Sequence, residues 1–145
     1  MFTIDASVYI NALHPTEADS ADSRAFIERV FQLPRPVYSP TLLLVEIAAA
    51  IARVFDQTEQ AITLAQAIYE LPGQIWVSLD ENQAQATLHL AAAQRLRGAD
   101  AVYAAVAQKY QTTLITRDQQ QLARLRSVLP VLTPAEALNL SSLKL

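Results

Sequence analysis

The segment FTIDASVYINAL, residues 2–13, decides the fold, because a short apolar run passes into a helix through a single acidic residue. It predicts a strand over residues 2–4 and a helix over residues 7–13. The pattern returns in TLITRDQQQL, residues 113–122, where a strand at 113–115 precedes a helix that runs from Asp118 to Arg126. Strands that alternate with helices in this way favour parallel pairing through right-handed crossovers.

The rest of the chain continues the alternation without a linker or an internal repeat. Further helices are expected at residues 20–33, 41–55, 58–71, 80–97 and 100–110 and from 133 onward, and further strands at 37–38, 75–77 and 131–132. Thr41, Thr58 and Asp80 are expected to cap their helices, Asp80 in a capping box with Gln83, and Gly98 suits the C′ position after residue 97. We therefore predict one α/β domain over residues 1–145. Its four- or five-stranded parallel sheet has the order 3-2-1-4-5 and helices on both faces.

The amino-acid composition limits which partners and which cellular location the protein can have. The chain has 145 residues, of which 52% are hydrophobic and 17% charged, with a net charge of −3 and no cysteine. So high an apolar fraction predicts a buried subunit interface, consistent with a homodimer or a groove for a partner. The negative charge gives no general basic field for nucleic acid. No signal-peptide pattern is present, and the most hydrophobic segment, residues 42–52, is too short to cross a bilayer. We expect a cytoplasmic protein without a membrane partner.

Four acidic residues carry most of the functional information: Asp5, Glu46, Asp100 and Asp118. Asp5 and Asp118 follow the first and fourth strands, which are neighbours at the switch point of the predicted order, where such sheets bind ligands. Asp100 opens the helix that leads into the fourth strand, and the apolar helix that carries Glu46 can pack over the same edge. Clustered carboxylates there predict a site for a hard divalent cation such as magnesium, and hence phosphate chemistry.

Each acid also has a purely structural explanation. Asp5, Asp100 and Asp118 stand where helix N-caps stand, and Asp118 has the capping-box spacing to Gln121. Glu46 lies in a helix that is apolar nearly all round, so it is expected to be paired, on a metal, or at a solvent-facing edge.

Other residues near the acids allow more than one role. Ser7 could cap the first helix or support the site, and Thr116 and Arg117 could contact a phosphate or complete a turn. His14 and His89 lack the spaced partners of a zinc site. With only two glycines, the chain has no glycine-rich phosphate loop.

Four segments together resemble the PIN domain, in particular the small single-domain ribonucleases that act as toxins in bacterial and archaeal toxin–antitoxin pairs. They are FTIDASVYINAL (2–13), TLLLVEIAAAIAR (41–53), GADAVYAAVAQKY (98–110) and TLITRDQQQL (113–122). The resemblance covers essentially the whole chain. It implies a three-layer α/β fold and a magnesium- or manganese-dependent endoribonuclease that uses one or two ions and leaves a 5′-phosphate and a 3′-hydroxyl. RNA is then the substrate and a cognate antitoxin the protein partner.

The four acidic positions of the family correspond to Asp5, Glu46, Asp100 and Asp118. On this resemblance the three aspartates are the main metal ligands, and the glutamate binds through water or orients the nucleophile. The family's hydroxyl two residues before the last aspartate is Thr116, and its small polar residue two after the first is Ser7. Arg117 is a further candidate for contact with the substrate.

Two other functional classes stay open. A phosphoaspartate switch or phosphatase also places aspartate after strands. However, a receiver domain needs adjacent acids after its first strand, and a haloacid-dehalogenase-like phosphatase needs an aspartate where this chain has Ser7. A non-catalytic interaction module would use the acids only as caps. That module predicts no metal binding and no loss of function when asparagine replaces aspartate.

Overall fold

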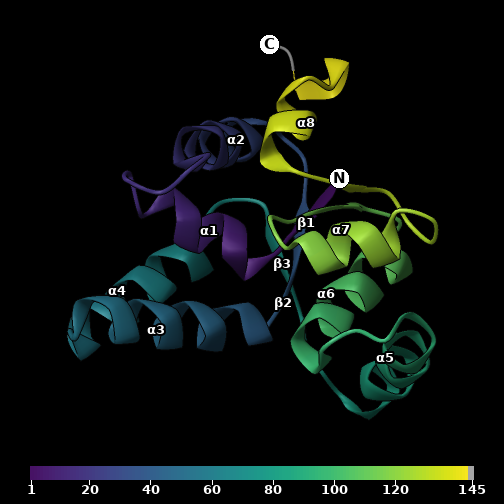
Figure 1. Cartoon of the computed structure of the whole chain (residues 1–145). Coiled ribbons are helices and arrows are strands. Elements are labelled where there is room, and N and C mark those ends of the chain that lie inside the picture. The colour runs from purple at the N-terminus through teal and green to yellow at the C-terminus, as the bar shows by residue number, and fades with distance from the viewer. Residues whose placement is uncertain (144–145) are drawn as a thin grey trace.

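A five-stranded parallel sheet runs through the centre of the computed structural model, which describes residues 1–143 (Figure 1). Its strands are β1 (Phe2–Ile4), β2 (Val37–Pro40), β3 (Gln74–Val77), β4 (Thr113–Ile115) and β5 (Val131–Leu132). They lie in the order β3-β2-β1-β4-β5, and every pair is parallel. The predicted fold class and strand order are therefore confirmed.

Helices cover both faces of the sheet and make three layers (Figure 1). One face carries α1 (Ala6–Ala12), α2 (Ser20–Gln32), α3 (Leu42–Phe55) and α4 (Thr58–Tyr69), and the other carries α5 (Glu81–Gln94), α6 (Gly98–Lys109) and α7 (Gln119–Leu125). The short α8 (Pro134–Leu138) packs against α2 and leads into the 3₁₀ turn Ser141–Leu143. The chain steps from β1 outward to β3 and then crosses back to β4 and β5, so right-handed connections place the two sets of helices on opposite faces.

The central pair β1 and β4 positions the functional edge. Phe2, Thr3 and Ile4 pair with Thr113, Leu114 and Ile115, and the backbone N–H of Asp5 continues the ladder to the carbonyl of Ile115 at 2.9 Å. Helix α6 packs on β1, β2 and β4, and its seven residues from Ala101 to Ala107 are all buried. The carboxyl ends of β1 and β4 therefore lie side by side at one edge of the sheet, at its switch point.

The helix ends follow some of the sequence signals and depart from others. Asp80 caps α5 through the backbone N–H of Gln83 at 2.8 Å, but the side chain of Gln83 accepts a hydrogen bond from Lys109 at 3.1 Å. Thr41 makes no side-chain cap, and Gln57 occupies the N-cap position expected for Thr58. The capping box of Thr133 and Glu136, with proline at the first turn, is formed.

The largest departure lies between α5 and α6. Helix α5 ends at Gln94, before the expected residue 97, because Arg95 takes the left-handed conformation with φ 53°. The N–H of Leu96 then bonds to the carbonyl of Ala91 at 3.0 Å and closes the helix. Gly98 consequently begins α6 and does not serve as C′, and Arg97 becomes the N-cap of α6. Asp100 is thus the third residue of α6, not its cap.

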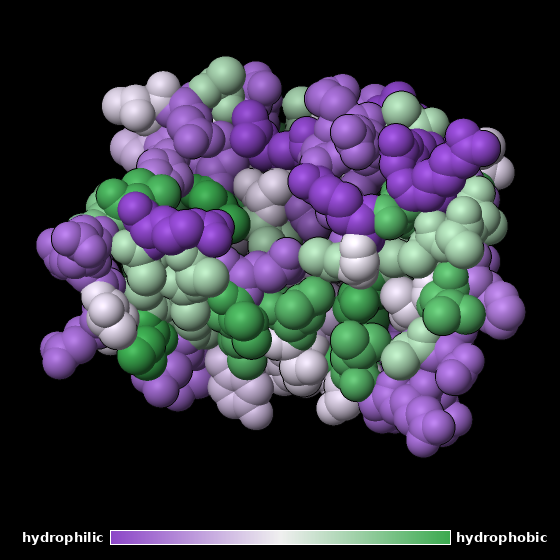
Figure 2. Space-filling view, turned by 60° about the horizontal axis from the view of Figure 1, so that its bottom comes forward, coloured by the Kyte–Doolittle hydropathy of each residue, from purple (hydrophilic) through white to green (hydrophobic). Residues whose placement is uncertain are grey.

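Large apolar side chains gather on the surface of α3 and α4. Those at least two-fifths exposed are Val45, Val54 and Phe55 on α3 and Ile62 and Tyr69 on α4. Figure 2 shows hydrophobic residues in a band across the face that lies at the bottom of Figure 1. Although α3 is apolar nearly all round, one side of it therefore faces outward. Within residues 1–143, no helix combines the length and hydropathy that crossing a membrane requires.

Candidate active site

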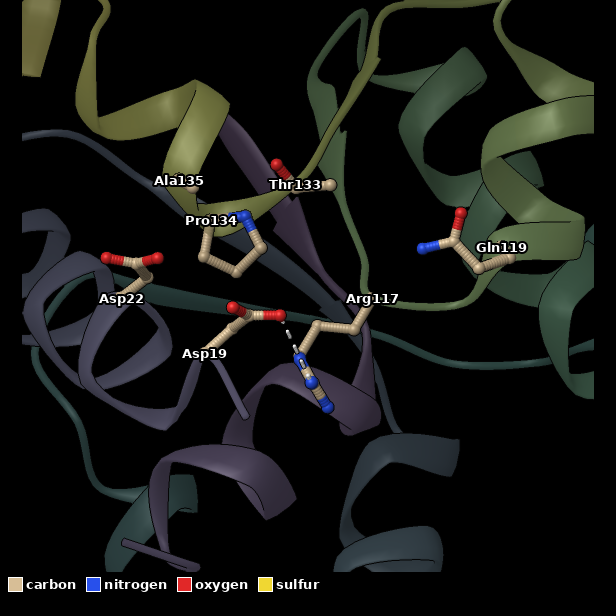
Figure 3. A pocket seen from close by; sticks show the side chains of 7 residues that line it. All are labelled: Asp19, Asp22, Arg117, Gln119, Thr133, Pro134 and Ala135. Atoms are coloured by element: carbon tan, nitrogen blue, oxygen red, sulfur yellow. Dashed lines mark ion pairs between the residues drawn. The ribbon is translucent and has the colours of Figure 1, made fainter. Parts of the chain in front are cut away.

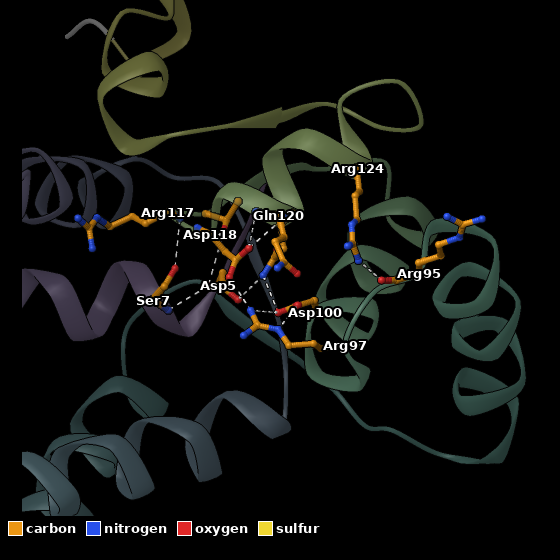
Figure 4. A network of polar contacts seen from close by, with 11 residues as sticks. Asp5, Ser7, Arg95, Arg97, Asp100, Arg117, Asp118, Gln120 and Arg124 are labelled. Carbon is orange, nitrogen blue, oxygen red and sulfur yellow. Dashed lines mark hydrogen bonds and ion pairs between the residues drawn. The ribbon is translucent and has the colours of Figure 1, made fainter.

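The four predicted acids line one hollow of about 420 Å³ at the carboxyl edge of the sheet. Asp5 comes from the end of β1, Glu46 from α3, Asp100 from the first turn of α6, and Asp118 from the turn between β4 and α7. Figure 4 shows the three aspartates directed toward one another from these separate elements. The sheet topology therefore brings together residues that are far apart in the sequence.

Asp5 is buried and held by donors on both carboxylate oxygens. Its Oδ2 accepts the backbone N–H of Ser7 at 3.0 Å, which caps α1, and the hydroxyl of Thr116 at 3.4 Å. Its Oδ1 accepts Nε2 of Gln121 at 3.2 Å. Burial raises the pKa of Asp5, the hydrogen bonds from Ser7 and Gln121 oppose that rise, and the nearby charge of Asp100 adds to it. Capping and site formation are thus combined in one side chain.

Gln121 is a residue of the site that the sequence did not reveal. Its Nε2 donates to Oδ1 of Asp5 at 3.2 Å and to Oδ1 of Asp100 at 3.0 Å, so one amide joins two carboxylates. Its backbone N–H donates to Oδ1 of Asp118, the N-cap of α7, at 3.0 Å, as the capping-box spacing predicts, but its side chain does not bond back to the N–H of Asp118. The available signal was a polar residue at a position of α7 that faces inward with Leu122 and Leu125. Gln121 is fully buried, and its Oε1 has no hydrogen-bond partner among the described residues.

Glu46 is half-buried and paired with a tyrosine. The buried hydroxyl of Tyr103, on α6, donates to Oε2 of Glu46 at 2.5 Å. Burial raises the pKa of Glu46, the Tyr103 hydrogen bond lowers it, and the charges of Asp5 and Asp100 raise it further. These charges act on Glu46 because the acids share one hollow. Tyr103 fixes the orientation of the carboxylate within it.

Asp118 has one oxygen committed to the backbone and one directed into the hollow. Its Oδ1 accepts the N–H groups of Gln120 at 2.8 Å and Gln121 at 3.0 Å, which confirms the predicted cap of α7. Its own N–H bonds to the hydroxyl of Thr116 at 3.0 Å. Its Oδ2 meets the guanidinium of Arg97 at 2.5 Å.

Ser7 and Arg117 connect the site to a second hollow. The hydroxyl of Ser7 accepts the backbone N–H of Arg117 at 3.2 Å (Figure 4). The guanidinium of Arg117 donates to the carbonyl of Ala18 at 2.9 Å. That guanidinium points into a separate pocket of about 180 Å³, where Asp19 lies 3.8 Å away (Figure 3). The predicted contact of Arg117 with a substrate therefore has to be made from this pocket and not from the acidic hollow.

The donor set suits a hard divalent cation. Its members are oxygen ligands, they line one hollow, and pairs of them already share a hydrogen-bond donor. Among residues 1–143, however, no three acidic or histidine side chains stand close enough to form a complete metal site. Arg97 lies between Asp100 and Asp118, and Glu46 is directed to Tyr103. Of the residues that line the hollow, Asp5, Asp100 and Asp118 are the ones that would hold an ion.

Solved structures of other proteins share the fold of this chain. VapC20 of Mycobacterium tuberculosis, described as a toxin that cleaves the sarcin–ricin loop, superposes with a TM-score of 0.69 and 16% identity, covering 85% of this chain and 94% of that one. FitAcB of Neisseria gonorrhoeae gives 0.68 and 19%, covering 93% and 99%. A toxin–antitoxin complex from Klebsiella pneumoniae gives 0.65 and 18%, covering 92% and 98%. A search of curated proteins found no match.

A scan against protein families matches residues 2–127 to the PIN domain, a range that includes all four acids and Gln121. The matched range covers β1 to α7 and therefore every element that contributes to the hollow. The chain belongs to the PIN-domain family.

Proposed function

We propose that this PIN domain is a divalent-metal-dependent endoribonuclease and the toxin of a toxin–antitoxin pair. The observation that carries the proposal is the convergence of Asp5, Glu46, Asp100 and Asp118 on one hollow at the switch point of the sheet. Two of the solved structures that resemble it are described as a toxin–antitoxin complex and as a toxin. The metal is magnesium or manganese, and the substrate is RNA.

Neighbouring polar residues hold the four acids in place. Gln121 holds Asp5 and Asp100 side by side, although their charges repel. Tyr103 orients Glu46, and Thr116 fixes the backbone at Asp118. A divalent ion bound there supplies Lewis acidity for phosphoryl oxygens and a nucleophilic water at neutral pH. Glu46, whose pKa is raised by burial, would orient an attacking water or accept its proton at the carboxylate.

Thermal unfolding with and without Mn²⁺ tests the metal site without knowledge of the RNA. At 100 times its dissociation constant an ion stabilises the folded state by about 2.7 kcal/mol. In a domain of this size that raises the melting temperature by roughly 5–11 °C. Asp100→Asn should lose most of this rise, because it removes one ligand charge. Asp80→Asn is the matched control, since Asp80 caps α5 outside the hollow and asparagine is an equally good cap.

No rise in the wild type would refute the metal site. A rise that survives in Asp100→Asn would place the ion elsewhere. Once binding is established, sequencing the 5′-phosphorylated ends of cellular RNA after incubation with the protein identifies the cleaved sites. Binding of beryllofluoride, a mimic of the acyl phosphate, to an aspartate of the protein, with no RNA cleavage, would instead favour a phosphoaspartate enzyme.

We further propose that the exposed apolar residues of α3 and α4 form a protein interface, either between two copies or with an antitoxin. Val45, Val54 and Ile62 are each about half exposed or more, which is a large apolar area for a free surface. A homodimer predicts twice the monomer mass in sedimentation equilibrium, reduced by Val54→Asp. A monomer in the wild type at micromolar concentration would leave this surface to the antitoxin.

A further inference from the structure

Arg97 makes the closest charged contacts in the acidic hollow. Its Nε donates to Oδ2 of Asp100 at 2.7 Å, and its Nη2 reaches Oδ1 of the same residue at 3.3 Å and Oδ2 of Asp118 at 2.5 Å. One guanidinium therefore joins two of the three aspartates assigned to the metal. Figure 4 shows the guanidinium of Arg97 directed toward these aspartates.

The backbone gives Arg97 this position. It is the N-cap residue of α6, and Asp100 follows three residues later in the first turn. A positive side chain is unfavourable at a helix N-terminus, where the macrodipole favours negative charge. The two carboxylates compensate for this, and the contacts with Asp100 and Asp118 raise the pKa of Arg97. The arginine is therefore held by the acids and not by its own helix.

The oxygens that Arg97 contacts are the ones a metal needs. Oδ1 of Asp118 already accepts two backbone N–H groups, which leaves Oδ2 for a ligand. Oδ1 of Asp100 already accepts Nε2 of Gln121, which leaves its Oδ2. An ion such as Mg²⁺ requires oxygen contacts at about 2.0–2.1 Å. To bind both free oxygens it would have to enter the space that the Arg97 guanidinium now fills.

Arg97 is also readily displaced. Its side chain is 64% exposed, whereas those of Asp100 and Asp118 are 9% and 23% exposed. An ion pair with one exposed partner contributes little free energy, because water solvates that partner nearly as well once the pair is broken. A divalent ion brings twice the charge to the same oxygens. The exchange thus requires only rotation of an exposed side chain.

We propose that Arg97 is a built-in competitor of the divalent cation, which neutralises Asp100 and Asp118 and lowers the affinity of the site for the metal. The inference rests on the proposed function only in taking these acids as metal ligands. The strength typical of exposed ion pairs corresponds to roughly a 1.5- to 5-fold change in dissociation constant. Removing Arg97 should therefore tighten metal binding by a factor in this range.

The test is isothermal titration of Mn²⁺ into the wild type, Arg97→Gln and Arg53→Gln. Arg53 is the matched control, because it lines the same hollow and its replacement changes the charge equally, but it makes no ion pair with the described acids. The expected result is a dissociation constant roughly 1.5- to 5-fold lower in Arg97→Gln and unchanged in Arg53→Gln. Arg97→Lys, which keeps the charge but not the planar two-point contact, should fall between wild type and Arg97→Gln.

The outcomes separate the two proposals. Equal or weaker binding in Arg97→Gln would overturn the competitor role while leaving the metal site intact. Equal tightening in both glutamine variants would also overturn it, because charge alone would then explain the effect. Absence of Mn²⁺ binding in all variants would instead refute the proposed function and with it the premise. Circular dichroism of each variant verifies the fold before titration.

Discussion

Replacing Gln121 by methionine should destabilise the protein through the acids that its amide joins. Methionine is unbranched and of similar size, so the change removes hydrogen bonds more than volume. Two hydrogen bonds to carboxylates are lost, each worth at least about 1.5 kcal/mol, for a total of about 3 kcal/mol. Removal of the buried, unpartnered Oε1 returns about 1 kcal/mol. The free energy of unfolding should therefore fall by about 2 kcal/mol at pH 7.

Urea unfolding measures this loss directly. The midpoint should decrease while the slope m stays constant, and the melting temperature should fall by roughly 4–8 °C. Gln120→Met is the matched control, since Gln120 is an exposed neighbour on α7 whose side chain makes no hydrogen bond in the described structure. It should change stability by less than about 0.5 kcal/mol.

The loss should also depend on pH. The pKa of Asp5 is already raised in the folded state, and the Gln121 hydrogen bond opposes that rise. Without Gln121 the folded-state pKa of Asp5 rises further. As the pH increases from the unfolded-state pKa of Asp5 to its folded-state pKa, the variant therefore loses more stability than the wild type. Below the unfolded value of about 3.9 both forms carry a protonated Asp5, and this part of the difference disappears. A loss under about 1 kcal/mol, or one equal at pH 4 and pH 7, would refute the role assigned to the amide.

Three further changes test other contacts of the site. Tyr103→Phe removes the donor to Glu46 and should lower the free energy of unfolding by roughly 1–2 kcal/mol at pH 7, measured by urea titration. Glu46→Gln should be more stable than wild type at neutral pH, because the raised pKa of Glu46 means that stability is lost as pH rises. The advantage should vanish below about pH 4.3, and one that persists there would contradict this cause. Thr116→Val leaves the N–H of Asp118 without its acceptor and should cost about 1–2 kcal/mol, seen as a melting point roughly 2–8 °C lower.

The sequence predicts those features that depend on short-range chemistry. Alternating apolar runs and helix signals give the strand order, and an acid between a strand and the next helix gives the placement of Asp5 and Asp118 at one edge. Caps at Asp5, Asp80 and Asp118 follow from the same local preference, because the N–H groups they accept lie two or three residues away. Such contacts depend only on residues that are close in the sequence.

The contacts that the sequence could not predict join elements distant in the chain. Gln121 has the spacing of a capping-box partner, but its amide bonds to Asp5 and Asp100, since two buried carboxylates need a donor more than an exposed cap does. Arg97 was placed at the end of a helix. The left-handed turn at Arg95 ends that helix early and carries Arg97 to the start of the next one. Neither outcome can be read from local preference, because Gln121 bonds to carboxylates on other elements and the helix ends at a left-handed arginine and not at the glycine.

The distribution of the site along the chain has a consequence for protein synthesis. Asp5 stands at the end of the first strand to be made, yet the amide that holds it is 116 residues further on. The central strand β1 likewise pairs with β4, which is synthesised more than a hundred residues later. Parallel pairings of such long range form late and slowly. A chain still emerging from the ribosome, with α7 unmade, has no assembled acidic centre, so the activity proposed here would arise only once nearly the whole domain is complete.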